Sequence, residues 1–114
     1  MVRRLILAAA LLAPVAAMAH HGWGTFDRAQ TVDLAGDVVS SSYVNPHGVV
    51  VLRDGGQALT FELAPVSRMQ ARGLAAEDIA PGRRVRLFAY RNTQDPNLLR
   101  AEWIQVGDRR VELR

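Results

Sequence analysis

The chain has 114 residues, of which 49% are apolar, and it contains no cysteine. This length allows one domain, the apolar fraction excludes a disordered chain, and the missing cysteines exclude a disulfide framework, a thiolate metal site and a catalytic thiol. Fourteen basic residues against 11 acidic ones give a formal net charge of +3. Whether that charge points to nucleic acid depends on the first residues of the chain.

Residues 1–19 are typical of a secretory signal peptide. Two arginines near the start are followed by the uncharged, largely apolar stretch 5–19, which ends in the small residues of Ala17-Met18-Ala19. This stretch is shorter than the roughly 20 residues of a membrane-spanning helix. We therefore predict cleavage between Ala19 and His20, and a periplasmic or secreted protein with no membrane span.

Cleavage also changes the charge of the protein. It removes two of the 14 basic residues, so residues 20–114 carry 12 arginines against 11 acidic residues. Binding to nucleic acid requires a marked basic excess to neutralise phosphates. A nearly neutral exported domain does not meet that requirement, so nucleic acid is excluded as a partner.

Residues 20–30 show little periodicity and are predicted to form an N-terminal arm, whereas 31–114 alternate as strands of a single domain. Strands are predicted at 32–43 with a bend near Gly36, at 49–52, 59–63, 84–90 and 99–106, and at a short edge over 111–113. A helix is predicted after Pro65, ending at Gly73. Three strands, a helix and two strands are the element order of a small OB-like barrel of five to six strands, with the helix between strands three and four.

All three histidines lie in two short motifs, His20-His21 at the predicted new terminus and Asn45-Pro46-His47 after the first strand. Cleavage would free an amine on His20 that can chelate an ion together with its own ring, and His47 could add a second imidazole if the arm folds back. His21 is the alternative ligand. Such nitrogen-rich sets suit Cu(II), so we predict binding of copper or another transition metal. The alternative is that these histidines only start the chain and support a turn.

The sequence contains little catalytic machinery. It has no Gly-x-Ser-x-Gly elbow and no phosphate-binding glycine loop followed by lysine. The neighbouring carboxylates Glu77 and Asp78 fall in a connector, where solvated or helix-capping roles are expected. We predict a protein that is not an enzyme, with metal-dependent activity as the remaining catalytic possibility.

Aromatic residues define a second candidate surface. Strand alternation places Phe88 and Tyr90 on the face opposite the core, and with Trp23 and Asn45 they would form the surface of an envelope module that binds a polysaccharide or a protein partner. The alternative is that Trp23 and Phe26 of the N-terminal arm pack over them and close a satellite hydrophobic cluster.

The motifs together resemble a family of small exported bacterial proteins catalogued only as a domain of unknown function. In this sequence the motifs are His20-His21-Gly22, Phe26-Asp27, Thr31-Val32-Asp33-Leu34-Ala35-Gly36, Asn45-Pro46-His47 and Pro81-Gly82. The chain departs from the commoner pattern at Gly22-Trp23 and at Gly48, and neither departure removes a histidine. The resemblance implies a single periplasmic or secreted barrel-like domain whose signature includes both histidine motifs, and it carries no activity with it.

Overall fold

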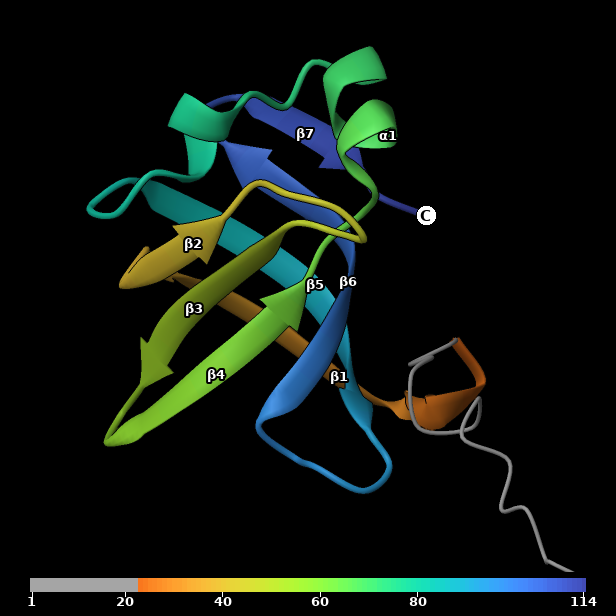
Figure 1. Cartoon of the computed structure of the whole chain (residues 1–114). Coiled ribbons are helices and arrows are strands. Elements are labelled where there is room, and N and C mark those ends of the chain that lie inside the picture. Colours follow the sequence, from red (N-terminus) through yellow and green to blue (C-terminus); the bar gives the residue numbers. More distant parts are fainter. Residues whose placement is uncertain (1–22) are drawn as a thin grey trace, which may run out of the picture.

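Strands are the main elements of residues 23–114, together with one short α-helix and two 3₁₀ helices. The structure is a computed structural model, and it describes residues 23–114. The elements in chain order are η2 (Trp23–Thr25), β1 (Phe26–Asp37), β2 (Ser40–Ser42), β3 (Val49–Asp54), β4 (Gln57–Glu62), α1 (Val66–Ala71), η3 (Ala76–Ile79), β5 (Arg84–Asn92), β6 (Leu98–Val106) and β7 (Arg109–Glu112) (Figure 1).

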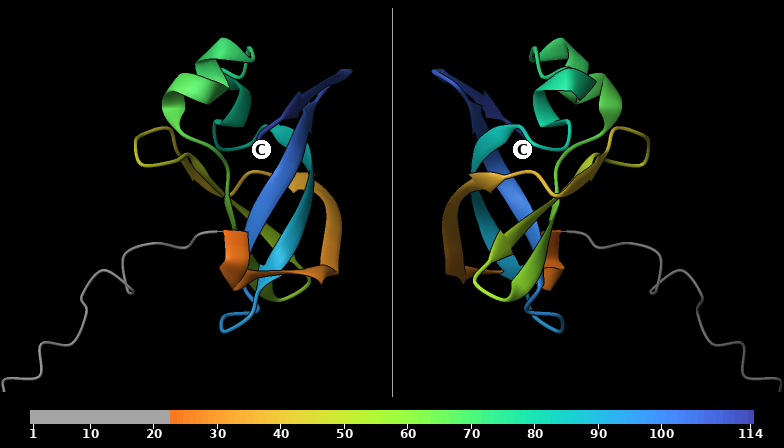
Figure 2. Two further views of the ribbon diagram at one scale, coloured as in Figure 1. Left: turned by 90° about the vertical axis from the view of Figure 1, so that its right-hand side faces the viewer. Right: turned by 90° about the vertical axis from the view of Figure 1, so that its left-hand side faces the viewer.

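The strands form one curled sheet with the order β1-β5-β6-β4-β3-β2, and β7 pairs with β6. All pairs are antiparallel except β4 with β6. The two end strands do not pair with each other, but they are consecutive in the chain, so the sheet wraps around a common interior (Figure 2). The structure confirms the predicted mainly β, OB-like fold, with its helix after the third predicted strand. The barrel is open, because its two end strands are not paired. Seven strands replace the predicted five to six because the first one is split in two.

The split lies at Val38 and Val39, two residues beyond the predicted bend. Val38 exchanges backbone hydrogen bonds with the turn at 82–83 (2.8 Å each), whereas the Val39 N–H donates to Val51 on β3 (2.9 Å). The chain therefore passes from one part of the sheet to the other at these two residues. β1 also begins earlier than predicted, at the buried Phe26. The sequence does not reveal this start because a register shift between Asp27 and Thr31 interrupts the alternation of apolar and polar residues.

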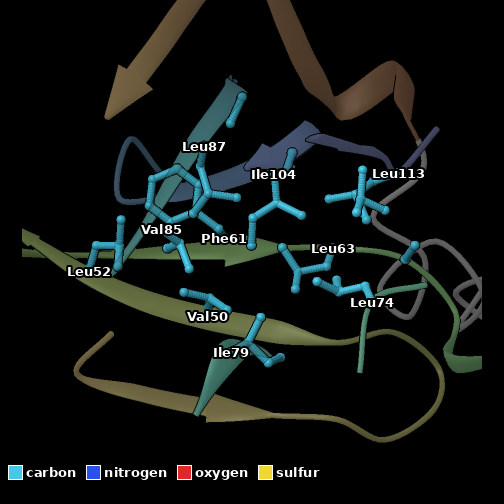
Figure 3. Packing of buried hydrophobic residues seen from close by; sticks show 14 of the residues in the cluster. Val50, Leu52, Phe61, Leu63, Leu74, Ile79, Val85, Leu87, Ile104 and Leu113 are labelled. Atoms are coloured by element: carbon cyan, nitrogen blue, oxygen red, sulfur yellow. The ribbon is translucent and has the colours of Figure 1, made fainter. Parts of the chain in front are cut away.

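The interior is filled by apolar side chains from both halves of the curled sheet and from the connector after α1. Phe61 near the end of β4 is fully buried, as are Leu59 and Leu63, which alternate with it along the chain. Ile79 of η3 is also fully buried, as the sequence predicts (Figure 3). The buried cluster consists of Val38, Val50, Leu52, Leu59, Phe61, Leu63, Ala64, Met69, Leu74, Ile79, Val85, Leu87, Ala89, Leu99, Ala101, Ile104, Val106, Val111 and Leu113.

The helix α1 ends at Ala71, and Gly73 follows its C-cap Arg72 as the predicted terminating glycine. Gly73 has φ +82°, its N–H donates to Gln70 O (3.1 Å), and the N–H of Leu74 donates to Met69 O (2.9 Å). These two bonds form a Schellman motif, in which a left-handed glycine satisfies the last carbonyls of the helix. The chain then turns so that Met69 and Leu74 both enter the core.

Asp78 caps η3, the role that the sequence favours for this carboxylate. Its Oδ2 accepts from the N–H of Ala75 (2.8 Å) and from Arg109 Nη2 on β7 (3.1 Å). The Ala75 N–H, and then Arg109, lower the pKa of Asp78 below its ordinary 3.8, against the opposing effect of burial. The ionised carboxylate therefore ties the connector to the last strand.

Replacing Asp78 by asparagine is expected to reduce stability in a pH-dependent way. Because the pKa of Asp78 is lowered by folding, its stabilisation is fully present above pH 3.8 and is lost as the pH falls through the folded-state value. Solvent screening limits the expected difference to about 0.5 kcal/mol at pH 7. Denaturant unfolding at pH 7 and below pH 3 measures it. A wild-type advantage that persists unchanged in acid would contradict the assignment.

Within residues 23–114 no helix is both long enough and apolar enough to cross a membrane.

Candidate functional site

The segment 43–48 between β2 and β3 carries the second histidine motif and is anchored at two points. The hydroxyl of Tyr43 donates to Leu74 O (2.5 Å), and Asn45 Oδ1 accepts from the N–H of Val66 at the start of α1 (3.2 Å). Asn45 thus supports the helix start, and its peptide bond to the following proline is cis. The loop is therefore held against the α1 end of the sheet.

Gly48 fixes the end of this loop beside the core. Its N–H donates to Ala64 O and its carbonyl accepts from the N–H of Leu63, both at 2.8 Å. A Cβ at this position would lie 2.7 Å from Met69 Cε, so a side chain here would displace a buried methionine. The absent side chain allows the backbone after His47 to approach β4 closely.

One ring nitrogen of His47 faces its own backbone. Nδ1 lies 3.2 Å from Gly48 O, and a carbonyl oxygen can only accept. This contact requires the proton on Nδ1 and leaves the lone pair of the neutral ring on Nε2. A ring held in this way resembles metal-ligating histidines, whose second nitrogen usually donates to a carbonyl or carboxylate.

Nε2 of His47 faces a buried carboxylate. It lies 3.8 Å from Glu62 Oε1, and Glu62 Oε2 lies 3.6 Å from Arg100 Nη1. Glu62 is only 4% exposed. The parallel pairing of β4 with β6 places Arg100 directly beside Glu62, and Glu62 is in turn opposite Val49 on β3. We call these three side chains the His47–Glu62–Arg100 cluster.

The first described residue of the arm, Trp23, covers the arginine of this cluster. The guanidinium carbon of Arg100 lies 4.9 Å from the Trp23 ring centre, and that of Arg114 lies at the same distance. Trp23 also meets Tyr90 edge-on, with ring centres 6.0 Å apart. The arm is thus attached to the sheet directly beside the cluster.

Burial acts on both residues beneath Trp23. It lowers the pKa of the Arg100 guanidinium, an effect that the Glu62 charge opposes, and it raises the pKa of Tyr90. Arginine nevertheless keeps its charge at neutral pH because its ordinary pKa exceeds 12. Arg100 is therefore a permanent cation on the side of Glu62 that faces away from His47.

Of the three predicted metal ligands, His20, His21 and His47, the structure describes only His47. His20 and His21 lie outside the described residues, and His47 is the histidine found beside other polar groups. Over residues 23–114 no group of three or more histidine, aspartate or glutamate side chains could hold a metal ion.

Glu62 and Arg100 are the members of the cluster that the sequence does not reveal. Glu62 alternates with the core residues of β4 and is therefore expected to face solvent. Arg100 precedes a bulge on β6, where the pairing skips from Ala101 to Trp103. The sequence signal for these two residues is that Glu62 and Arg100 carry opposite charges on strands that become neighbours. This signal identifies the pair only once the order of the strands in the sheet is known.

The predicted aromatic surface is a connected set of rings. Phe88 stacks on Trp103 (5.8 Å) and meets Tyr90 edge-on (5.7 Å). Two guanidinium groups, those of Arg86 and Arg110, lie over Trp103 at 5.5 and 4.2 Å. The contact of Trp23 with Tyr90 agrees with the packing alternative for Trp23, and partner binding by these rings stays a prediction.

Comparison with known proteins identifies a family whose function is unknown. No curated protein matches the chain, and no solved structure matches it. A family model described as a family of unknown function, DUF6152, matches residues 8–98, which is most of the chain and includes both histidine motifs. The chain therefore belongs to DUF6152, a family of unknown function.

Proposed function

We propose that this protein is exported and binds a transition metal ion, Cu(II) in particular, between its mature N-terminus and His47. The observation that supports this most directly is the contact series from the arm to the histidine. Trp23 lies on Arg100, Arg100 pairs with Glu62, and Glu62 faces His47.

The spacing along the chain supports the same proposal. His20 precedes Trp23 by three residues, and three extended residues span about 10 Å. Three successive contacts, Trp23 with Arg100, Arg100 with Glu62 and Glu62 with His47, connect Trp23 to the His47 ring. The proposal is that the terminal amine and ring of His20 approach an ion held at His47 Nε2 along this side of the sheet.

The chemistry of these groups favours copper. Cleavage before His20 would supply an amine and an imidazole from one residue, and His47 would supply a second imidazole with its lone pair on Nε2. Three nitrogen ligands suit Cu(II), whereas Mg²⁺ and Ca²⁺ prefer oxygen. Export is part of the proposal because the predicted cleavage creates the amine.

A copper titration of the mature protein tests this function. Three forms are compared: protein beginning at His20, the same protein with its terminal amine acetylated, and His47→Ala in the mature form. Acetylation should raise the Kd for Cu(II) about 100-fold because it removes the amine ligand, and His47→Ala should raise it at least tenfold. Quenching of tryptophan fluorescence in a Trp103→Phe background reports the binding through Trp23.

The control is the thermal unfolding of each form without metal, which should be the same for the acetylated and the free terminus. Equal copper affinity in all three forms would overturn the proposal.

A further inference from the structure

Glu62 occupies an unusual environment for a carboxylate. Its side chain is almost completely buried, with 4% of its surface exposed. Within the described chain its Oε2 has no hydrogen-bond partner. The nearest cationic atom, Arg100 Nη1 at 3.6 Å, is well beyond the 2.7–2.9 Å of a charge-assisted hydrogen bond. A buried carboxylate is costly unless its charge is compensated. Glu62 therefore lies near the Arg100 cation without a close hydrogen bond to it.

The distance from Glu62 to His47 fits two ligands of one ion. Nε2 and Oε1 are 3.8 Å apart, which is too far for a hydrogen bond. With metal bonds of about 2.0 Å to nitrogen and about 2.1 Å to oxygen, two ligands lie about 3.3 Å apart at a tetrahedral angle and about 4.1 Å apart on opposite sides. The observed separation falls between these limits, so an ion fits between the two atoms with little movement.

The neighbouring groups orient both atoms toward this gap. The His47 Nδ1 contact with Gly48 O directs Nε2 to Glu62, and Arg100 attracts the other carboxylate oxygen, Oε2. Trp23 covers Arg100 from outside. Arg100 would therefore act as a positioning residue that leaves Oε1 facing the histidine.

We propose that Glu62 Oε1 is an oxygen ligand of the metal held by His47, so that the site is mixed nitrogen and oxygen. This inference rests on the proposed function and changes its chemistry. A mixed set with imidazole selects borderline ions such as Cu(II) and Zn(II) over the oxygen-seeking Ca²⁺ and Mg²⁺.

Glu62→Gln in the mature protein is the direct test, with Cu(II) as the probe. The amide preserves the shape of the side chain and removes the anionic ligand, so the Kd for Cu(II) should rise at least tenfold and the EPR parameters of bound copper should shift toward an all-nitrogen set. Glu102→Gln is the matched control, since Glu102 is also largely covered and lies 3.8 Å from an arginine, Arg114. It should change neither quantity.

A second variant guards against misfolding. Glu62→Asp keeps the charge but withdraws the carboxylate by one methylene, so it should also weaken copper binding and shift the EPR spectrum. If both Glu62 variants bind copper with wild-type affinity and spectrum while acetylation of the terminal amine weakens binding, the inference is wrong and the proposed function stands. If acetylation and His47→Ala have no effect either, the proposed function itself has failed.

Discussion

Replacing Phe61 by alanine is expected to lower the free energy of unfolding by about 4 kcal/mol. Phe61 is fully buried on β4, opposite Val50 of β3 and Leu99 of β6, at the point where antiparallel and parallel pairing meet. Its truncation removes apolar burial and leaves a cavity that three paired strands cannot easily close. Because small domains are stable by about 5–15 kcal/mol in total, this one change would remove much of the stability.

Denaturant unfolding at pH 7 measures the loss, with two controls. Phe61→Leu retains most of the volume and should cost about 1.5 kcal/mol. Val44→Ala lies on the loop between β2 and β3, where Val44 is 61% exposed, and should have little effect. A loss below about 1.5 kcal/mol for Phe61→Ala would show that the core is not organised around this side chain.

The importance of Phe61 follows from the sequence, as does much of the fold. Alternation of Leu59, Phe61 and Leu63 with polar neighbours identifies β4 and its inner face. Gly73 is recognisable as a helix end because its place after a helical pattern favours a left-handed residue, and the observed φ of +82° agrees. These features are local, so a single stretch of chain is sufficient to define them.

Features that depend on distant partners are not visible in the same way. The early start of β1 depends on the pairing of Phe26 with Asn92 across a register shift. The split of the first predicted strand depends on bonds that Val38 makes to the turn at 82–83. Neither pairing leaves a periodic trace in the sequence, because the alternation is interrupted where each occurs.

The candidate site also contains some residues that the sequence alone reveals and others that depend on distant strand pairing. Histidine is rare in this chain, so the motifs that contain His20, His21 and His47 can be recognised from composition alone. The contact of His47 with Glu62 follows from the register of β3 on β4, and that of Glu62 with Arg100 follows from the parallel pairing of β4 and β6. Composition thus indicates a metal-binding chemistry, and sheet topology adds the carboxylate and its arginine.

Removing the cation of this cluster should strongly destabilise the protein even without metal. Arg100→Met leaves Glu62, 4% exposed, without its neighbouring guanidinium, and breaking a buried ion pair from one side costs about 3 kcal/mol. The substitution also removes the cation from the face of Trp23, a contact worth about 1 kcal/mol. Denaturant unfolding of the metal-free protein at pH 7 should detect the combined loss.

Adding Glu62→Gln to Arg100→Met should restore most of that loss, because the double variant no longer buries an uncompensated charge. Arg86→Met is the matched control: Arg86 also pairs with an acid, Asp33, and lies over a tryptophan, but both partners of its ion pair are about half exposed. Exposed pairs contribute little, so this variant should lose only a small part of what Arg100→Met loses. Equal losses at the two arginines, or a double variant less stable than Arg100→Met, would mean that the Glu62 charge is not compensated by Arg100. Recovery in the double variant would instead show that Arg100 compensates the charge of Glu62 in the folded protein.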